Sequence, residues 1–199
     1  DALRGIENNG SKAPLNVTHS KLHRNEYGLY LSKGITKSSN SLIYRNSSYG
    51  IYATLSDSGD SVWLDHNTIV YNSNYGVYAR RSYSSTGPIT IQNNIVARNS
   101  SASSYGYEIY SSSSSYTPVC KNNLIWDTAG TTLYNLTCTN TTHYNPLFVN
   151  ASGDDYHIGH RSPARKAGIS SSDAGALAWT THKTPGLHGY LFEPPQLSS

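Results

Sequence analysis

The sequence predicts an all-β protein, a single-stranded parallel β-helix of roughly five to six coils followed by a C-terminal extension. Three observations predict this fold. A short phrase, tyrosine-glycine-aliphatic-tyrosine, recurs along the chain, and a second polar phrase precedes each copy. Short segments of alternating apolar and polar residues lie between them. Spacings of 22, 26 and 30 residues between the copies are typical of a repeat architecture with loops of variable length.

The composition agrees with β structure and excludes two classes of partner. Only 14% of the 199 residues are charged and the formal net charge is +3, without the clustered Lys and Arg that nucleic-acid binding requires. No apolar run approaches the roughly 20 residues of a membrane span. The chain shows no signal peptide and contains no Met, so we interpret it as a processed product or a fragment.

The tyrosine phrase stands at residues 27–30, 49–52 and 75–78, with a looser copy at 105–108. In stacked coils, equivalent positions form ladders. We therefore expect an inner ladder and an outer aromatic ladder, the inner one of Leu29, Ile51, Val77 and Tyr107, the outer one of Tyr30, Tyr52 and Tyr78, continued by Glu108. Such an outer ladder suits the binding of sugar rings or a partner surface, and equally suits simple cross-strand stacking.

The polar phrase, Asn or Ser followed by aliphatic residues and closed by Asn or Thr, predicts a second short strand and a turn. It occupies 20–25, 41–46, 67–72, 94–99 and 123–128. We expect its final Asn, at Asn25, Asn46, Asn72 and Asn99, to adopt a left-handed backbone and to bond the turn of the neighbouring coil.

The alternating segments 61–66, 88–93 and 118–123 predict the third strand of each coil. Val62 and Leu64 face one way there, and Trp63 and Asp65 face the other. Three strands per coil imply three parallel sheets around a narrow core, with coils about 4.8 Å apart. The expected organisation is a lead-in or partial coil at 1–14, coils at 15–142, a closing segment at 143–178 and an extended tail at 179–199.

The segment 145–168, followed by 173–179, resembles the C-terminal closing motif of secreted right-handed parallel β-helix proteins of the pectate-lyase-like superfamily. The matching residues are Asn145-Pro146-Leu147-Phe148, Gly153-Asp154, Ser162-Pro163-Ala164, Gly168 and Asp173-Ala174-Gly175-Ala176. The acid usual before the last Ala-Gly is replaced by Lys166. The resemblance spans about 15–179 and implies a right-handed helix and secretion. It leaves the chemistry open, because that superfamily contains lyases, hydrolases, epimerases and non-catalytic fibres.

Modification sites support an extracellular or cell-surface location. Seven Asn-x-Ser/Thr acceptors occur, at Asn9, Asn16, Asn46, Asn99, Asn135, Asn140 and Asn150. Two of them, Asn46 and Asn99, also belong to the expected Asn ladder, and a buried ladder residue cannot carry a glycan. Cys120 and Cys138 are the only cysteines, and we expect them to form a disulfide that contributes about 3 kcal/mol.

A candidate acid–base site rests on the resemblance to β-helix polysaccharide lyases, which need a Lys or Arg base and neutralise a uronate carboxylate, often with Ca²⁺. The candidate residues are Asp57, Asp60, Arg80, Arg81 and Glu108. The alternative interpretation is a set of surface salt bridges, each worth under about 1 kcal/mol. Outside the lyase hypothesis we expect no cofactor and no metal site.

Three functions therefore stay open. The favoured one is a secreted, glycosylated structural β-helix that assembles end to end with copies of itself, joined through the tail residues Tyr190, Leu191 and Phe192 by strand addition. The second is a carbohydrate-active enzyme, a polysaccharide lyase or glycoside hydrolase. The third is a carbohydrate-binding module that uses Tyr30, Tyr52 and Tyr78.

Overall fold

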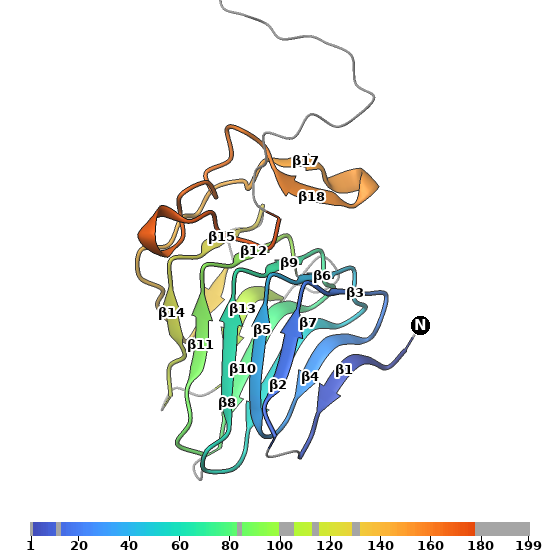
Figure 1. The fold of residues 1–199 in the computed structure, drawn as a ribbon, viewed down its shortest axis with the longest axis vertical. Coiled ribbons are helices and arrows are strands. Elements are labelled where there is room, and N and C mark those ends of the chain that lie inside the picture. The colour runs from blue at the N-terminus through green and yellow to red at the C-terminus, as the bar shows by residue number, and fades with distance from the viewer. Residues whose placement is uncertain are drawn as a thin grey trace, which may run out of the picture.

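The computed structural model describes residues 2–10, 13–82, 85–99, 106–112, 116–128 and 132–177. The chain winds as a parallel β-helix in which successive coils each add one strand to three sheets (Figure 1). All strand pairs within these three sheets are parallel. The predicted fold class is confirmed.

Sheet A contains six strands and sheets B and C contain five each, which agrees with the expected number of coils. Sheet A consists of β1 (Arg4–Asn8), β4 (Tyr27–Leu31), β7 (Tyr49–Leu55), β10 (Tyr75–Arg81), β13 (Tyr107–Ser111) and β16 (Leu133–Tyr134). Sheet B consists of β2 (Leu15–Thr18), β5 (Ile35–Ser39), β8 (Ser61–Asp65), β11 (Ile89–Gln92) and β14 (Val119–Lys121). Sheet C consists of β3 (Lys21–His23), β6 (Leu42–Tyr44), β9 (Thr68–Val70), β12 (Ile95–Ala97) and β15 (Leu124–Trp126).

The inner ladder of sheet A is confirmed for three of its four predicted members. Leu29, Ile51 and Val77 are completely buried. The fourth prediction is wrong, because Val77 pairs with Ile109 and Tyr75 pairs with Tyr107. The fourth copy of the repeat therefore starts two residues later than the Tyr-Gly pair suggested, and Glu108 takes the position that glycine holds in the other copies.

The turns between sheets C and A differ from the prediction by one residue. Positive φ angles occur at Arg24, Arg45, Tyr71 and Arg98, each directly before a ladder asparagine. The asparagine then follows the left-handed residue, which leaves its amide directed along the stack. Asn46, for example, donates its Nδ2 to Asn72 Oδ1 at 2.8 Å.

The segment after the coils packs against the side of the helix, on the outer face of sheet C (Figure 1). It contains the antiparallel pair β17 (Phe148–Asn150) and β18 (Asp155–Ile158) and two short 3₁₀ turns, η1 (Ala151–Gly153) and η2 (Ile169–Ser171). Its buried residues Tyr156, Ile158, Ala164 and Ala174 form an apolar layer with sheet C. The three central strands of sheet C, β6, β9 and β12, are thus buried on both faces, which explains their short and mainly apolar sequences.

The predicted disulfide between Cys120 and Cys138 is present, with Cα atoms 4.6 Å apart. It joins β14 to the segment that follows β16. Two isolated parallel bridges, Lys121 to Thr139 and Leu124 to Thr142, continue the coil pattern beyond the bond. The covalent link therefore secures the last coil to the coil before it. In the ranges given above, no helix is long and apolar enough to cross a membrane.

Candidate functional site

The acidic half of the candidate acid–base site is used to build a turn. Asp60 is 5% exposed, and its carboxylate accepts hydrogen bonds from the backbone N–H groups of Gly34, Ser56 and Asp57 at 2.6, 3.1 and 2.8 Å. Asp57 is exposed and forms an ion pair with Lys33 at 3.2 Å. Asp60 therefore holds the connection between β7 and β8 to the coil before it.

The basic half lies at the C-terminal end of β10, at the same corner one coil later. The guanidinium of Arg81 lies 3.8 Å from the centroid of the Tyr116 ring, and Arg80 is exposed beside Thr54 of β7. Glu108 lies at the opposite end of the sheet A strands, inside the helix. The five residues are therefore distributed over two corners and do not converge on one reacting centre.

Glu108 ends the Asn ladder. The ladder runs from Asn25 through Asn46 and Asn72 to Asn99, each residue donating to the next. The following coil offers no fifth Asn, because Thr128 takes that place in the phrase and is exposed. The carboxyl group of Glu108 fills this position, and burial raises its pKa to about 8. The prediction that Glu108 lies on the outside is wrong, because the fourth copy of the repeat begins at Tyr107 and not at Tyr105.

The outer aromatic ladder is present and is twice as wide as predicted. Tyr30, Tyr52 and Tyr78 stack with centroids 5.1 and 4.9 Å apart, and Tyr110 and Tyr134 extend the column. A second column stacks beside it, with centroid distances of 5.2, 5.3 and 6.4 Å, and contains Tyr27, Tyr49, Tyr75 and Tyr107. We call the nine side chains of both columns the tyrosine face. The second column was missed because strict alternation along the strand predicts that the first Tyr of each phrase points into the core.

The ring geometry determines what the tyrosine face presents to solvent. Rings within a column are nearly parallel, whereas Tyr49 and Tyr52, from different columns, lie at 71°. In this herringbone arrangement the face of an inner ring is covered by its neighbours, and the ring edge with its hydroxyl group is left for a ligand. Burial, followed by the neighbouring tyrosines, raises the pKa of Tyr49 to about 12. Its hydroxyl therefore stays protonated and can donate a hydrogen bond.

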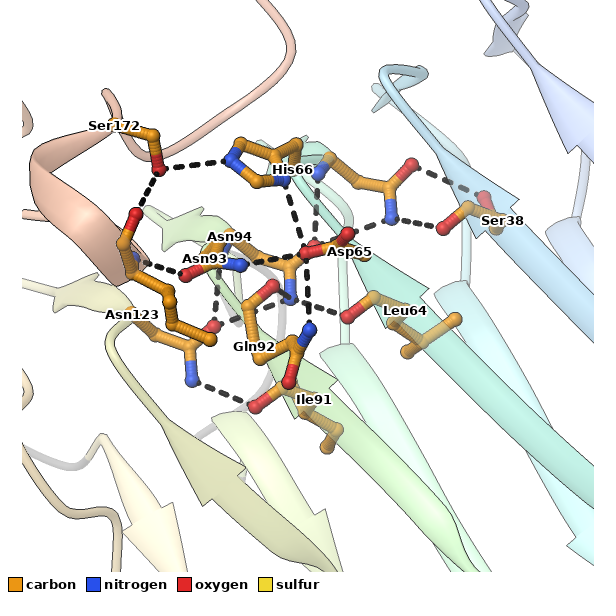
Figure 2. Close-up of polar contacts among 12 residues, drawn as sticks. Ser38, Leu64, Asp65, His66, Ile91, Gln92, Asn93, Asn94, Asn123 and Ser172 are labelled. Atoms are coloured by element: carbon orange, nitrogen blue, oxygen red, sulfur yellow. Dashed lines mark hydrogen bonds and ion pairs between the residues drawn. The ribbon is translucent and has the colours of Figure 1, made fainter.

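A polar cluster that the sequence did not reveal lies at the corner between sheets B and C (Figure 2). His66 Nδ1 lies 3.0 Å from Asp65 Oδ1, and His66 Nε2 lies 3.1 Å from Ser172 Oγ. The Asp65 carboxylate also accepts from Asn93 Nδ2 at 2.7 Å and Gln92 Nε2 at 3.4 Å. Burial acts to raise the pKa of Asp65, but these hydrogen bonds and the His66 charge outweigh it and lower the pKa.

The same cluster holds the closing segment to the coils. Asn93 Oδ1 accepts from the backbone N–H of Ile169 at 2.8 Å, and Asn93 O accepts from Gly175 N at 2.8 Å. A second, fully buried ladder lies next to this cluster. It is formed by the side chains of Asn67, Asn94 and Asn123, and the backbone N–H of Ser41 donates to its first member, Asn67. The sequence gives no signal for the contact between His66 and Ser172, because the two residues are 106 positions apart.

The glycosylation acceptors fall into two groups. Asn46 and Asn99 are buried, at 0% and 1% exposure, and their amides are occupied by the ladder. Of the two roles that the sequence left open for them, glycan acceptor and ladder residue, both have the ladder role. The other five acceptors are exposed, namely Asn9, Asn16, Asn135, Asn140 and Asn150.

Two further expectations concern metals and the tail. Within the part of the chain that the structure describes, no group of three or more His, Cys, Asp or Glu residues is arranged to hold a metal ion. The proposed assembly residues Tyr190, Leu191 and Phe192 lie outside the described residues. End-to-end assembly therefore stays a prediction.

Comparison with known proteins agrees with the fold. A family model described as a right-handed β-helix region matches residues 4–180. No curated protein and no solved structure matches the chain significantly.

Proposed function

Because the chain belongs to the right-handed β-helix family, we propose that it is a secreted, glycosylated scaffold that binds an extended polysaccharide along its tyrosine face. The two stacked columns of tyrosines on sheet A are the observation that carries this proposal. β-Helix proteins differ widely in chemistry, so the function has to be argued from this surface and not from the fold.

The tyrosine face offers hydroxyl groups at a regular interval. Ring centroids in the column from Tyr30 to Tyr134 follow one another at 4.7 to 5.4 Å. Hydroxyl groups repeated in this way along the helix axis can bond successive sugars of an extended polysaccharide that lies along the same axis. Each hydroxyl contributes one hydrogen bond worth about 0.5–1.5 kcal/mol, and the contributions of successive hydroxyls along the column add up.

The proposal of secretion rests on the covalent features of the chain. The disulfide between Cys120 and Cys138 is of a kind that persists in oxidising compartments. The five exposed acceptor asparagines are available for N-linked sugars, which a secreted glycoprotein would carry.

The test separates the hydroxyl groups from the rings that carry them. The triple variant Tyr52→Phe, Tyr78→Phe, Tyr110→Phe keeps the stack and removes three hydroxyls. We expect its affinity for the polysaccharide that binds best, chosen from a panel of neutral and acidic linear polymers by affinity electrophoresis, to fall by at least about tenfold. Its melting temperature should stay close to that of the parent chain.

The matched control is Tyr144→Phe, which removes the hydroxyl of a tyrosine that is 68% exposed and lies outside the tyrosine face. It should bind as the parent does. If the parent chain binds none of the polymers, or if the triple variant binds as tightly as the parent, the tyrosine face is only a stacking ladder and the proposal is wrong.

A further inference from the structure

The chain of contacts from Asp65 through His66 to Ser172 has the order and spacing of an activated nucleophile. A nucleophilic hydroxyl needs a base within about 2.6–3.2 Å, and the base needs a third group that orients it. Here the Oγ to Nε2 distance is 3.1 Å and the Nδ1 to Oδ1 distance is 3.0 Å (Figure 2). Such constellations are recognised by geometry and role, and they occur on unrelated folds.

The hydrogen-bond partners select the tautomer that catalysis requires. The Asp65 carboxylate is held by Asn93 and Gln92 as well as by His66, and its pKa is lowered. An ionised Asp65 accepts a hydrogen bond from the Nδ1–H group of His66, which leaves the lone pair of Nε2 directed at Ser172. In this structure the Ser172 hydroxyl donates to the Ile169 carbonyl oxygen at 2.9 Å, and a rotation about its Cβ–Oγ bond directs the proton to Nε2 of His66.

The backbone that presents Ser172 is strained. Ser170 and Ser171 both have positive φ angles, 56° and 61°, immediately before Ser172. A left-handed conformation costs a non-glycine residue about 1–2 kcal/mol. Single left-handed residues recur at the turns of the coils, but among the described residues only Ser170 and Ser171 follow one another directly. Two bonds close this turn, from Gly168 N to Ser172 O at 2.8 Å and from Ser172 N to Ile169 O at 3.2 Å. The position of the hydroxyl is therefore fixed by its own loop and not only by His66.

The site is open to solvent. The side chains of His66 and Asp65 are 26% and 34% exposed, and Ser172 is half-buried. An open edge suits a small acyl group that is carried on a larger molecule and presented from outside, and it offers little apolar surface for a long acyl chain.

We propose that Ser172, His66 and Asp65 form a nucleophilic site that hydrolyses short-chain carboxylic esters. Ser172 Oγ attacks the ester carbonyl carbon while His66 Nε2 takes the hydroxyl proton. The bond to the alcohol oxygen breaks, and His66 returns the proton to the departing alcohol. Water then attacks the acyl-serine with His66 as base, which releases the carboxylic acid and restores the Ser172 hydroxyl. Asp65 is the positioning residue for His66.

Labelling of the unmodified chain gives the primary test. We expect a fluorophosphonate probe to form one adduct, located on Ser172 by peptide mass spectrometry, and p-nitrophenyl acetate to be hydrolysed through an acetylated Ser172. An adduct on other serines only, or no adduct at all, would show that the contact between His66 and Ser172 is a structural tether and would overturn the proposal. This measurement does not depend on any variant folding.

Variants then assign the roles. Ser172→Ala should abolish the adduct, and His66→Gln, which keeps a hydrogen-bonding side chain but no base, should slow labelling by at least about 100-fold. Asp65→Asn should lower kcat with little change in KM. Ser58→Ala, at an exposed serine in the connection between β7 and β8, is the control and should label like the parent chain. If His66→Gln labels at the parental rate, Ser172 is not activated by His66 and the proposal fails.

Discussion

Asn99 donates its backbone N–H and its side-chain amide to the two carboxyl oxygens of Glu108, at 2.8 and 2.5 Å. In the strand register, Glu108 stands where earlier copies of the repeat have glycine. In space, its carboxyl group takes the place of the asparagine side chain that the next coil lacks. A buried acid therefore terminates a ladder otherwise built from neutral amides.

The first prediction is that Glu108 makes stability depend on pH. Burial raises its pKa from 4.5 to about 8, so the folded chain holds a proton that the unfolded chain has already released. The stability contribution is complete below the unfolded value and falls as pH rises through the window from 4.5 to about 8. Glu108→Gln should remove this loss and become more stable than the parent at high pH, by more than about 1.4 kcal/mol.

Urea unfolding of both proteins at several pH values between 4 and 9 measures this difference, because all other titrating groups cancel. A Glu108→Gln curve parallel to that of the parent across the whole range would mean that the buried carboxyl titrates as an ordinary one.

The second prediction concerns the interior of the ladder. Asn72 accepts from the Asn46 backbone and side chain at 3.1 and 2.8 Å and donates to Asn99 at 2.8 Å. Asn72→Ala leaves several buried groups without partners, and each such group costs about 1–3 kcal/mol. We expect a loss of at least about 3 kcal/mol in chemical unfolding. Asn74→Ala removes one half-buried bond, to Ser48 at 3.1 Å, and should cost less than about 1 kcal/mol. Equal losses for the two variants would contradict the importance of the ladder.

The third prediction explains why the repeat retains glycine. A Cβ atom at Gly50 would lie 2.7 Å from Asn72 Nδ2, 2.7 Å from the Gly76 carbonyl oxygen and 2.8 Å from a methyl group of Ile69. All three neighbours are buried and fixed, so Gly50→Ala should cost about 3 kcal/mol by thermal or chemical unfolding. At Gly10 a Cβ would meet nothing within 4 Å, and Gly10→Ala should be neutral. An unchanged melting temperature for Gly50→Ala would mean that the coils can move apart at little cost.

The sequence was sufficient for the fold because each ladder position recurs. Leu29, Ile51 and Val77 were placed inside, the sheets were predicted to be parallel, and the disulfide was predicted from the only two cysteines. These features follow from period and composition, which a single chain displays directly.

The rest depends on information that no repeat carries. The pair Tyr105-Gly106 imitates the repeat phrase, and only the strand register shows that the fourth copy begins at Tyr107, with glutamate in place of glycine. The left-handed residue before each ladder asparagine is often Arg or Tyr, which local preference disfavours. The contact between His66 and Ser172 arises from the packing of the closing segment on the coils, which residue spacing does not encode.

The fourth prediction is that glycans occupy only acceptors outside the ladder. In Asn46 the side-chain nitrogen that would carry the sugar donates to Asn72 Oδ1 at 2.8 Å and to the Leu22 carbonyl at 3.2 Å, with no exposed surface. A sugar there would break both bonds and force the coils apart. In secreted, folded protein we expect peptide mass spectrometry to find glycans among the five exposed acceptors and none on Asn46 or Asn99. The matched pair is Asn16→Gln, which should remove the glycan from an occupied Asn16 and leave stability unchanged, and Asn46→Gln, which should leave the mass of attached glycan unchanged and lower stability. A glycan on Asn46 in the folded protein would contradict the ladder itself.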